Sequence, residues 1–156
     1  MFLLFFIGFF SIQPGINNYD SSGYTPLMLS VIDKDYNKTE ELLKKGANPD
    51  IGRNTEKIYY KINQETLKTP LMYAATLGDF KTVKLLIKYG ADVNVRDKED
   101  DTPLHYAAYY VRPEIAKILV DNGALLNAKD IYGFTPLDYA KYKLAKDVVK
   151  LLQENN

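Results

Sequence analysis

Four near-copies of one short motif divide the chain into units of similar length. Each copy has Thr-Pro-Leu at its centre, and the threonines are Thr25, Thr69, Thr102 and Thr135. Successive threonines are separated by 44, 33 and 33 residues. Self-similarity at a spacing of about 20 to 50 residues is typical of stacked repeats, in which each unit is one small supersecondary element. The sequence therefore predicts a repeat protein.

Charge and composition exclude several other classes of protein. Of the 156 residues, 46% are hydrophobic and 26% are charged, as in an ordinary folded domain. Twenty basic residues balance twenty acidic ones, so no overall positive field favours nucleic acid. Cysteine is absent, which excludes disulfides and thiolate metal sites. We expect a monomer that does not bind nucleic acid.

Residues 1–19 form a separate N-terminal segment. Phe2 to Phe10 are a run of nine apolar residues, whereas a membrane-spanning helix needs about 20. This length is typical of the core of a secretory signal peptide, but no Lys or Arg precedes Lys34 and no Ala-x-Ala site follows. An apolar lid on the first repeat, an uncleaved membrane anchor and a misplaced start remain alternatives. We expect a secreted, periplasmic or membrane-associated protein if the run is a targeting segment, and a cytoplasmic one otherwise.

Each unit is predicted to contain two short helices. Pro suits the first helical position, where its missing N–H needs no partner, and the preceding Thr can cap the helix. In the third unit these rules predict helices from Pro103 to Tyr110 and from Pro113 to Asn122, with a stop at Gly123. A unit cannot bury its core alone, because apolar residues lie on more than one side of its helices. These residues include Leu104, Ala107, Ala108, Ile115, Ile118 and Leu119.

Two longer motifs keep a fixed register with the helix signals. The first is Thr102-Pro103-Leu104-His105 followed by Ala107-Ala108, and the second is Gly90 to Asn94 preceded by Val83 and Leu85-Leu86. In these motifs the chain resembles the ankyrin-repeat family over about four repeats, from Asp20 to Asn156. The resemblance implies an all-α solenoid of stacked helix-turn-helix units with projecting β-hairpin loops, whose concave face binds other proteins.

The first interval between motifs is eleven residues longer than the others, and we expect an enlarged hairpin finger there. Lys57 to Asn63 alternate apolar and polar residues, which suits a strand. Insertions often lie on the binding face, but a tolerated surface insertion is an equal alternative because loop length costs little stability. The last repeat carries polar residues around its helices, as a terminal cap requires. The predicted parts of the ankyrin-repeat domain, 20–156, are repeat 1 (20–53), the finger (54–68), repeat 2 (69–97), repeat 3 (98–130) and the capping repeat (131–156).

The sequence contains no recognisable catalytic constellation. The single histidine, His105, falls in the Thr-Pro-Leu-His motif, where the resemblance implies hydrogen bonds to loop backbone between adjacent repeats. A general base would need an orienting partner and a nucleophile within reach. The acidic run from Asp97 to Asp101 lacks the register of a calcium loop and is interpreted as a solvated turn. We expect no catalytic, cofactor-binding or metal-binding residues and no enzyme activity.

Binding is the better explanation for the thirteen tyrosines. In the family, the residues that suit a partner lie at the hairpin tip before Thr-Pro and at the exposed end of the first helix. Exposed Tyr and Phe give a large contact area at low entropic cost. Tyr73, Tyr106 and Tyr139 are instead predicted to pack in the stack with their hydroxyls at its edge. The candidate partner-binding residues are Tyr24, Leu77, Tyr109, Tyr110, Tyr132, Phe134 and Tyr142, with Tyr59 and Tyr60 in the finger.

These observations predict a module that binds a protein partner through its concave face. The alternative is a membrane-tethered or exported scaffold protein without a discrete partner face. Nothing in the sequence indicates which protein the partner is, because the surface of a repeat stack is adapted residue by residue.

Overall fold

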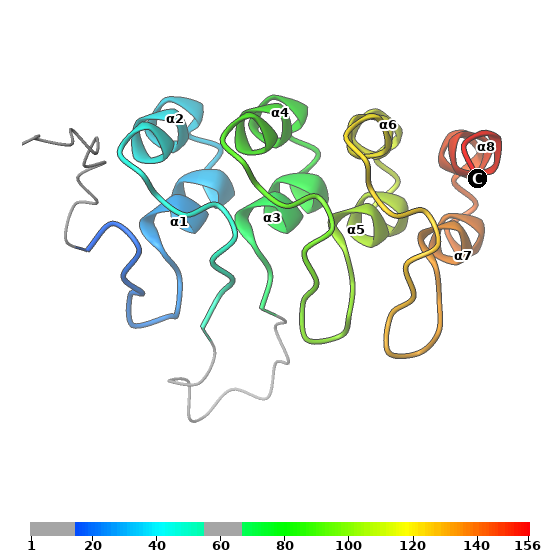
Figure 1. The fold of residues 1–156 in the computed structure, drawn as a ribbon, viewed down its shortest axis with the longest axis horizontal. Coiled ribbons are helices and arrows are strands. Elements are labelled where there is room, and N and C mark those ends of the chain that lie inside the picture. The colour runs from blue at the N-terminus through cyan, green and yellow to red at the C-terminus, as the bar shows by residue number, and fades with distance from the viewer. Residues whose placement is uncertain (1–14, 55–66) are drawn as a thin grey trace, which may run out of the picture.

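A computed structural model describes residues 15–54 and 67–156, and within them the chain is a row of four helix pairs (Figure 1). The first helices of the pairs form an inner row and the second helices an outer row, while the loops between pairs project beyond the inner row. This arrangement confirms the predicted all-α repeat solenoid. The inner helices are α1 (Pro26–Ile32), α3 (Pro70–Leu77), α5 (Pro103–Tyr109) and α7 (Pro136–Tyr142), and the outer helices are α2 (Tyr36–Lys44), α4 (Phe80–Lys88), α6 (Pro113–Asp121) and α8 (Lys146–Glu154).

The inner helices begin where the Thr-Pro signal places them. Each begins at a Pro that follows an extended Thr, so the predicted boundaries in the third unit are confirmed to within one residue. The hydroxyl of Thr25 accepts a hydrogen bond from the Met28 N–H at 3.3 Å. The outer helices α2 and α4 begin after an Asp, and the Asp35 carboxylate accepts from the Lys38 N–H at 2.9 Å. These local caps satisfy backbone donors that have no partner inside the helix.

A left-handed residue joins the two helices of every pair. It is Lys34, Gly78, Val111 and Leu144 in the four repeats, with φ values of 57°, 75°, 54° and 54°. Only glycine adopts this conformation without a steric cost, and the cost is greatest for a β-branched residue such as Val111. The turn therefore stores strain in three of the four repeats.

The core runs without interruption along the stack. Each inner helix packs on the next inner helix, and each outer helix packs on the next outer helix. Leu71, Leu104, Leu86 and Leu119 are completely buried between these rows. Full burial of a leucine side chain contributes about 1.5 to 3 kcal/mol, so most of the stability of a unit comes from its neighbours.

Three of the loops that precede the inner helices are short hairpins closed by one backbone hydrogen bond. The bonds run from Asp20 N to Tyr24 O, Asp97 N to Asp101 O and Asp130 N to Phe134 O, at 2.8, 3.1 and 3.0 Å. The first oxygen of each aspartate accepts two further backbone N–H groups of its own loop. Residues 15–54 and 67–156 contain no strand. In each of these hairpins the aspartate carboxylate therefore accepts backbone N–H groups that would pair with the opposite strand in a longer hairpin.

The loop that contains the insertion is closed by a backbone hydrogen bond equivalent to those of the three short hairpins. Arg53 N donates to Lys68 O at 3.1 Å, and Arg53 stands seven residues after Gly46 as Asp97 stands seven after Gly90. The extra residues therefore lie in the chain between Arg53 and Lys68. The alternating pattern, Tyr59 and Tyr60 lie outside the described residues, so the strand and the finger remain predictions. Residues 1–14 also lie outside them, and among the described residues no helix is long and apolar enough to cross a membrane.

Candidate partner-binding face

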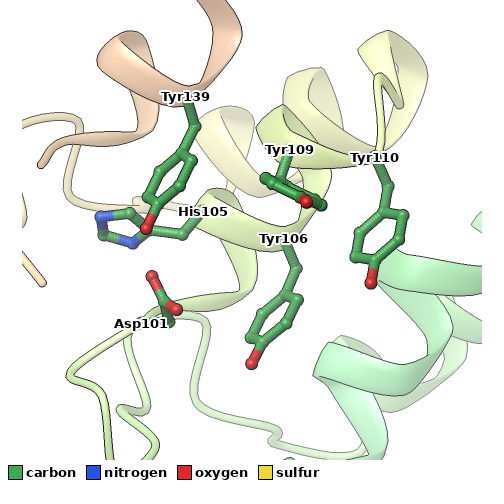
Figure 2. Close-up of a pocket in the computed structure, with 6 residues that line it drawn as sticks. All are labelled: Asp101, His105, Tyr106, Tyr109, Tyr110 and Tyr139. Atoms are coloured by element: carbon green, nitrogen blue, oxygen red, sulfur yellow. The ribbon is translucent and has the colours of Figure 1, made fainter. Parts of the chain in front are cut away.

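Two neighbouring clefts lie on the inner side of the last two repeats. The first has a volume of about 240 Å³ and opens between α5, α7 and the hairpin before α5 (Figure 2). The second, also about 240 Å³, opens between α7 and the hairpin before it. Tyr139 lines both clefts, so they form one continuous surface, which we call the tyrosine face. The first cleft is lined by Asp101, His105, Tyr106, Tyr109, Tyr110 and Tyr139, and the second by Tyr132, Phe134, Asp138, Tyr139 and Tyr142.

The rings of the tyrosine face hold one another in place. Tyr109 meets Tyr110 edge-on with centroids 5.1 Å apart, and Tyr109 meets Tyr139 edge-on at 5.8 Å. Phe134 lies against Tyr139 at 6.0 Å. Edge-to-face pairs at these distances contribute about 0.5 to 1.5 kcal/mol beyond the area that they bury. The face is therefore largely ordered before any partner arrives.

Tyr106 and Tyr139 fasten the hairpins to the inner helices. The Tyr106 hydroxyl donates to Asp97 Oδ2, and the Tyr139 hydroxyl donates to Asp130 Oδ2, both at 2.6 Å. The predicted packing of these two tyrosines with their hydroxyls at the edge of the stack is confirmed. Burial and the Asp130 hydrogen bond raise the pKa of the Tyr139 hydroxyl, so it stays protonated as a donor. Each aspartate thereby closes its loop with one oxygen and binds a helix with the other.

The interpretation of the acidic run as a solvated turn is wrong for Asp97. Its exposed fraction is 6%, because its carboxylate is enclosed by the loop whose N–H groups it accepts and by the Tyr106 ring. A sequence signal for this role exists, since Asp20, Asp97 and Asp130 all stand five residues before a motif threonine. Tyr73 is partly buried and has no described aspartate in this register, and its ring lies 6.1 Å from that of Tyr24.

His105 connects the third repeat to the fourth. Its Nδ1 accepts from the Thr102 N–H at 3.0 Å, which places the ring proton on Nε2. Nε2 then donates to the backbone oxygen of Phe134 in the next hairpin at 3.2 Å. The implied bond between adjacent repeats is therefore present. With an exposed fraction of 1% the ring is fully buried, and this burial lowers its pKa and favours the neutral form.

Family models agree with this geometry. A model described as "Ankyrin repeats (3 copies)" matches residues 51–130 and 71–156, and one described as "Ankyrin repeat" matches residues 22–54. The chain belongs to the ankyrin-repeat family. Ankyrin repeats generally act as protein–protein interaction modules and are typically non-enzymatic. A search of curated proteins gave no match to the chain.

Two carboxylate oxygens in one hairpin beside this ankyrin-repeat surface, Asp101 Oδ1 and Glu99 Oε2, are enclosed without a hydrogen bond from the described residues. Asp101 is half-buried at the base of the first cleft, and its Oδ1 is enclosed without a hydrogen bond in the part of the chain that the structure describes. Burial, together with the charges of Asp97, Asp130 and Glu99, raises the Asp101 pKa from 3.8 to about 7, and only Lys68 acts in the opposite direction. Asp101 directly precedes the motif threonine, a hairpin-tip position that the sequence marks as variable, since it holds Tyr24, Lys68 and Phe134 in the other repeats. Its partial burial and its enclosed oxygen could not be predicted from the sequence.

The other predicted binding residues fall into three groups. Tyr109, Tyr110, Tyr132, Phe134 and Tyr142 are exposed and line the clefts. Tyr24 and Leu77 are only partly exposed and line neither cleft, and the Arg53 guanidinium covers the Tyr24 ring at 4.2 Å. Tyr59 and Tyr60 lie outside the described residues.

The outer helices present a different surface. Side chains on three of them, α2, α6 and α8, form ion pairs along the helix, such as Lys44–Glu40 at 3.0 Å and Lys117–Asp121 at 3.1 Å. Such exposed pairs contribute about 0.3 to 0.5 kcal/mol each and keep the surface hydrated. Among the described residues, no three His, Cys, Asp or Glu side chains are placed to hold a metal ion. The apolar exposed surface is thus concentrated on the inner side.

Proposed function

We propose that this ankyrin-repeat protein binds a protein partner through the tyrosine face, and that Tyr109, Tyr110, Tyr132 and Phe134 carry much of the affinity. The observation that supports this most is the row of exposed aromatic rings across two adjacent repeats, on a stack in which three of the four outer helices carry ion pairs. A contiguous exposed apolar patch on a soluble domain marks an interaction site more often than chance.

The order within the tyrosine face supports the same proposal. Binding usually costs about 0.5 to 1.5 kcal/mol for each side chain that must be immobilised. Here the rings of Tyr109, Tyr110 and Phe134 already rest on aromatic neighbours, so little of that cost remains. Tyr and Phe in such pre-ordered positions are typical binding hot spots. Tyr24 and Leu77 contribute less in this proposal, because both are partly covered.

The proposal gives the chain a binding role as a monomer, without catalysis. The outward surface of α8, at the end of the stack in Figure 1, exposes Lys146, Asp147 and Lys150, so it does not favour stacking of a second copy. The alternative of a tethered or exported scaffold depends on residues 1–14, and no observation on the described residues favours it.

Two alanine variants and a matched control test the proposal. Tyr110→Ala and Phe134→Ala should each lower the affinity for an isolated partner at least tenfold, or by about 1.4 kcal/mol, without a large fall in melting temperature. Tyr36→Ala is the control, because Tyr36 is 38% exposed on the outer helix α2 while Tyr110 is 39% exposed. Binding that is unchanged in both test variants, or equally weakened by Tyr36→Ala, would refute the proposal.

A further inference from the structure

We propose that the first cleft of the tyrosine face receives an arginine side chain of the partner, with the guanidinium paired to Asp101 and lying against the surrounding tyrosine rings. This inference rests on the proposed function, since it assumes that the partner docks on the tyrosine face. It adds the chemistry of the residue that the partner inserts.

The charges around the cleft are unbalanced. Asp97, Glu99 and Asp130 all interact electrostatically with Asp101, and Lys68 is the cation that opposes them. The carboxylates of Asp97 and Asp130 are saturated by tyrosine hydroxyls and loop N–H groups. Oδ1 of the Asp101 carboxylate is enclosed and accepts no hydrogen bond from any described residue. A half-buried carboxylate without a partner is costly, so a cation from outside gains most at this position.

The tyrosine rings beside Asp101 already attract cations of the chain itself. The Lys143 ammonium lies 4.0 Å from the centre of the Tyr109 ring, and the Lys68 ammonium lies 4.6 Å from that of Tyr106. Such contacts contribute about 0.5 to 1 kcal/mol at exposed sites and about 2 when the cation is desolvated. In Figure 2 the Asp101 carboxylate points into the space beneath Tyr139 and beside Tyr106. A cation in that space would therefore meet a carboxylate and aromatic rings together.

Arginine matches these contacts better than lysine. Its guanidinium is planar, so it can stack on a ring while its edge donates two hydrogen bonds to one carboxylate. It is also less strongly hydrated than an ammonium group, which reduces the cost of entering a partly enclosed cleft. The cleft volume of about 240 Å³ suits a single long side chain rather than a folded element.

The test uses two small probes of nearly equal shape. N-acetylarginine methylamide carries the charge, and N-acetylcitrulline methylamide has a neutral urea group in its place. Each is titrated into the full chain while NMR follows the ring signals of Tyr109, Tyr139 and His105. We expect saturable shifts with the arginine probe and at least tenfold weaker binding of the citrulline probe. Equal binding of the two probes, or no shift with arginine, would overturn the inference.

Two neighbouring aspartates give a matched pair of variants. Asp101→Asn should lower the affinity for the arginine probe at least tenfold, whereas Asp100→Asn should leave that affinity unchanged. Asp100 is exposed on the same loop, lies outside the cleft lining and carries the same charge. Its φ of 62° is one that asparagine tolerates. Equal loss in both variants would show a general charge effect and would contradict the specific pairing.

The affinity should also depend on pH. Burial and the neighbouring carboxylates hold the Asp101 pKa at about 7, so the carboxyl is mostly protonated at pH 6 and mostly ionised at pH 8. The arginine probe should bind about tenfold more tightly at pH 8, by the ratio of ionised fractions. The titratable groups that face Asp101 are Asp97, Glu99, Asp130, Lys68, His105 and the tyrosines of the cleft, Tyr106, Tyr109, Tyr110 and Tyr139. Burial lowers the pKa of His105 and favours its neutral form. If Asp101 is the group that titrates, Asp101→Asn should abolish the dependence.

The failure of this inference can be told apart from the failure of the proposed function. If Tyr110→Ala lowers the affinity for the partner but Asp101→Asn does not, the partner binds the tyrosine face without placing an arginine in the first cleft. If neither variant changes partner affinity, the proposed function itself is wrong.

Discussion

Replacing Asp101 with asparagine should stabilise the fold near neutral pH and leave it unchanged in acid. The folded protein raises the Asp101 pKa from 3.8 to about 7, chiefly through burial and the charge of Asp97. Well below pH 3.8 the carboxyl is protonated in both the folded and the unfolded chain. Between pH 4 and 7 the unfolded chain ionises it freely while the folded chain does not, so stability falls as pH rises. Asparagine removes this contribution.

The size of the effect follows from the pKa shift and from solvent screening. The change from 3.8 to about 7 spans roughly three pKa units, and each unit corresponds to about 1.4 kcal/mol, giving an upper bound of about 4 kcal/mol. Asp101 is only half-buried, so water screens much of this energy. We therefore expect a gain of about 1 to 2 kcal/mol in the free energy of unfolding at pH 7.5.

Urea denaturation followed by circular dichroism at pH 4 and pH 7.5 measures the difference. The wild type, Asp101→Asn and the control Asp100→Asn are compared at both values. The Asp101 variant should gain several times more stability at pH 7.5 than at pH 4, where the unfolded chain ionises the carboxyl only in part. The control should follow the wild type at both values. A gain of the same size at both pH values, or a loss at pH 7.5, would refute the electrostatic explanation. A stabilised variant that no longer binds arginine would show that the chain retains a costly carboxylate for binding.

Three further substitutions test the scaffold, each by denaturant midpoint at an unchanged slope. Val111→Gly should raise the free energy of unfolding by about 0.5 to 1 kcal/mol, because it removes the backbone strain of a β-branched residue at a φ of 54°. A fall in the free energy of unfolding would contradict this strain. His105→Ala should lower it by about 2 to 3 kcal/mol, since the ring and its link to Phe134 are lost; a change below 0.5 kcal/mol would deny the link. Tyr106→Phe should lower it by about 1 kcal/mol by leaving Asp97 Oδ2 without its donor, and no change would mean that the hydroxyl does not fasten the hairpin.

The sequence was sufficient for the architecture because its signals are local. A Thr-Pro pair sets a helix start through its own cap and ring geometry, whatever lies nearby. The boundaries of α5 and α6 follow from Thr102, Pro103 and Pro113 in this way. The packing of Tyr106 and Tyr139 was also predictable, because each precedes a buried alanine on the inner helix.

The clefts could not be derived from the sequence because they depend on contacts between repeats. The first cleft brings together α5, α7 and a hairpin, so neither its shape nor its charge belongs to one repeat. Asp101 is perturbed by Asp130, which is 29 residues away in the chain. The burial of Asp97 is different, because its hydroxyl donor, Tyr106, is only nine residues away on the following helix. The shared register of Asp20, Asp97 and Asp130 could have indicated it.

A photo-crosslinking amino acid placed at two positions of the full chain, in the cell that produces it, tests the central claim most directly. Benzoylphenylalanine is introduced at Tyr142, which is 76% exposed on the tyrosine face, or at Lys117, which has a 64% exposed side chain on the outer helix α6. Both positions are open to solvent, so accessibility alone does not separate them. The account predicts a discrete crosslinked protein from position 142 and none from position 117. A crosslink from position 117 without one from position 142 would contradict it.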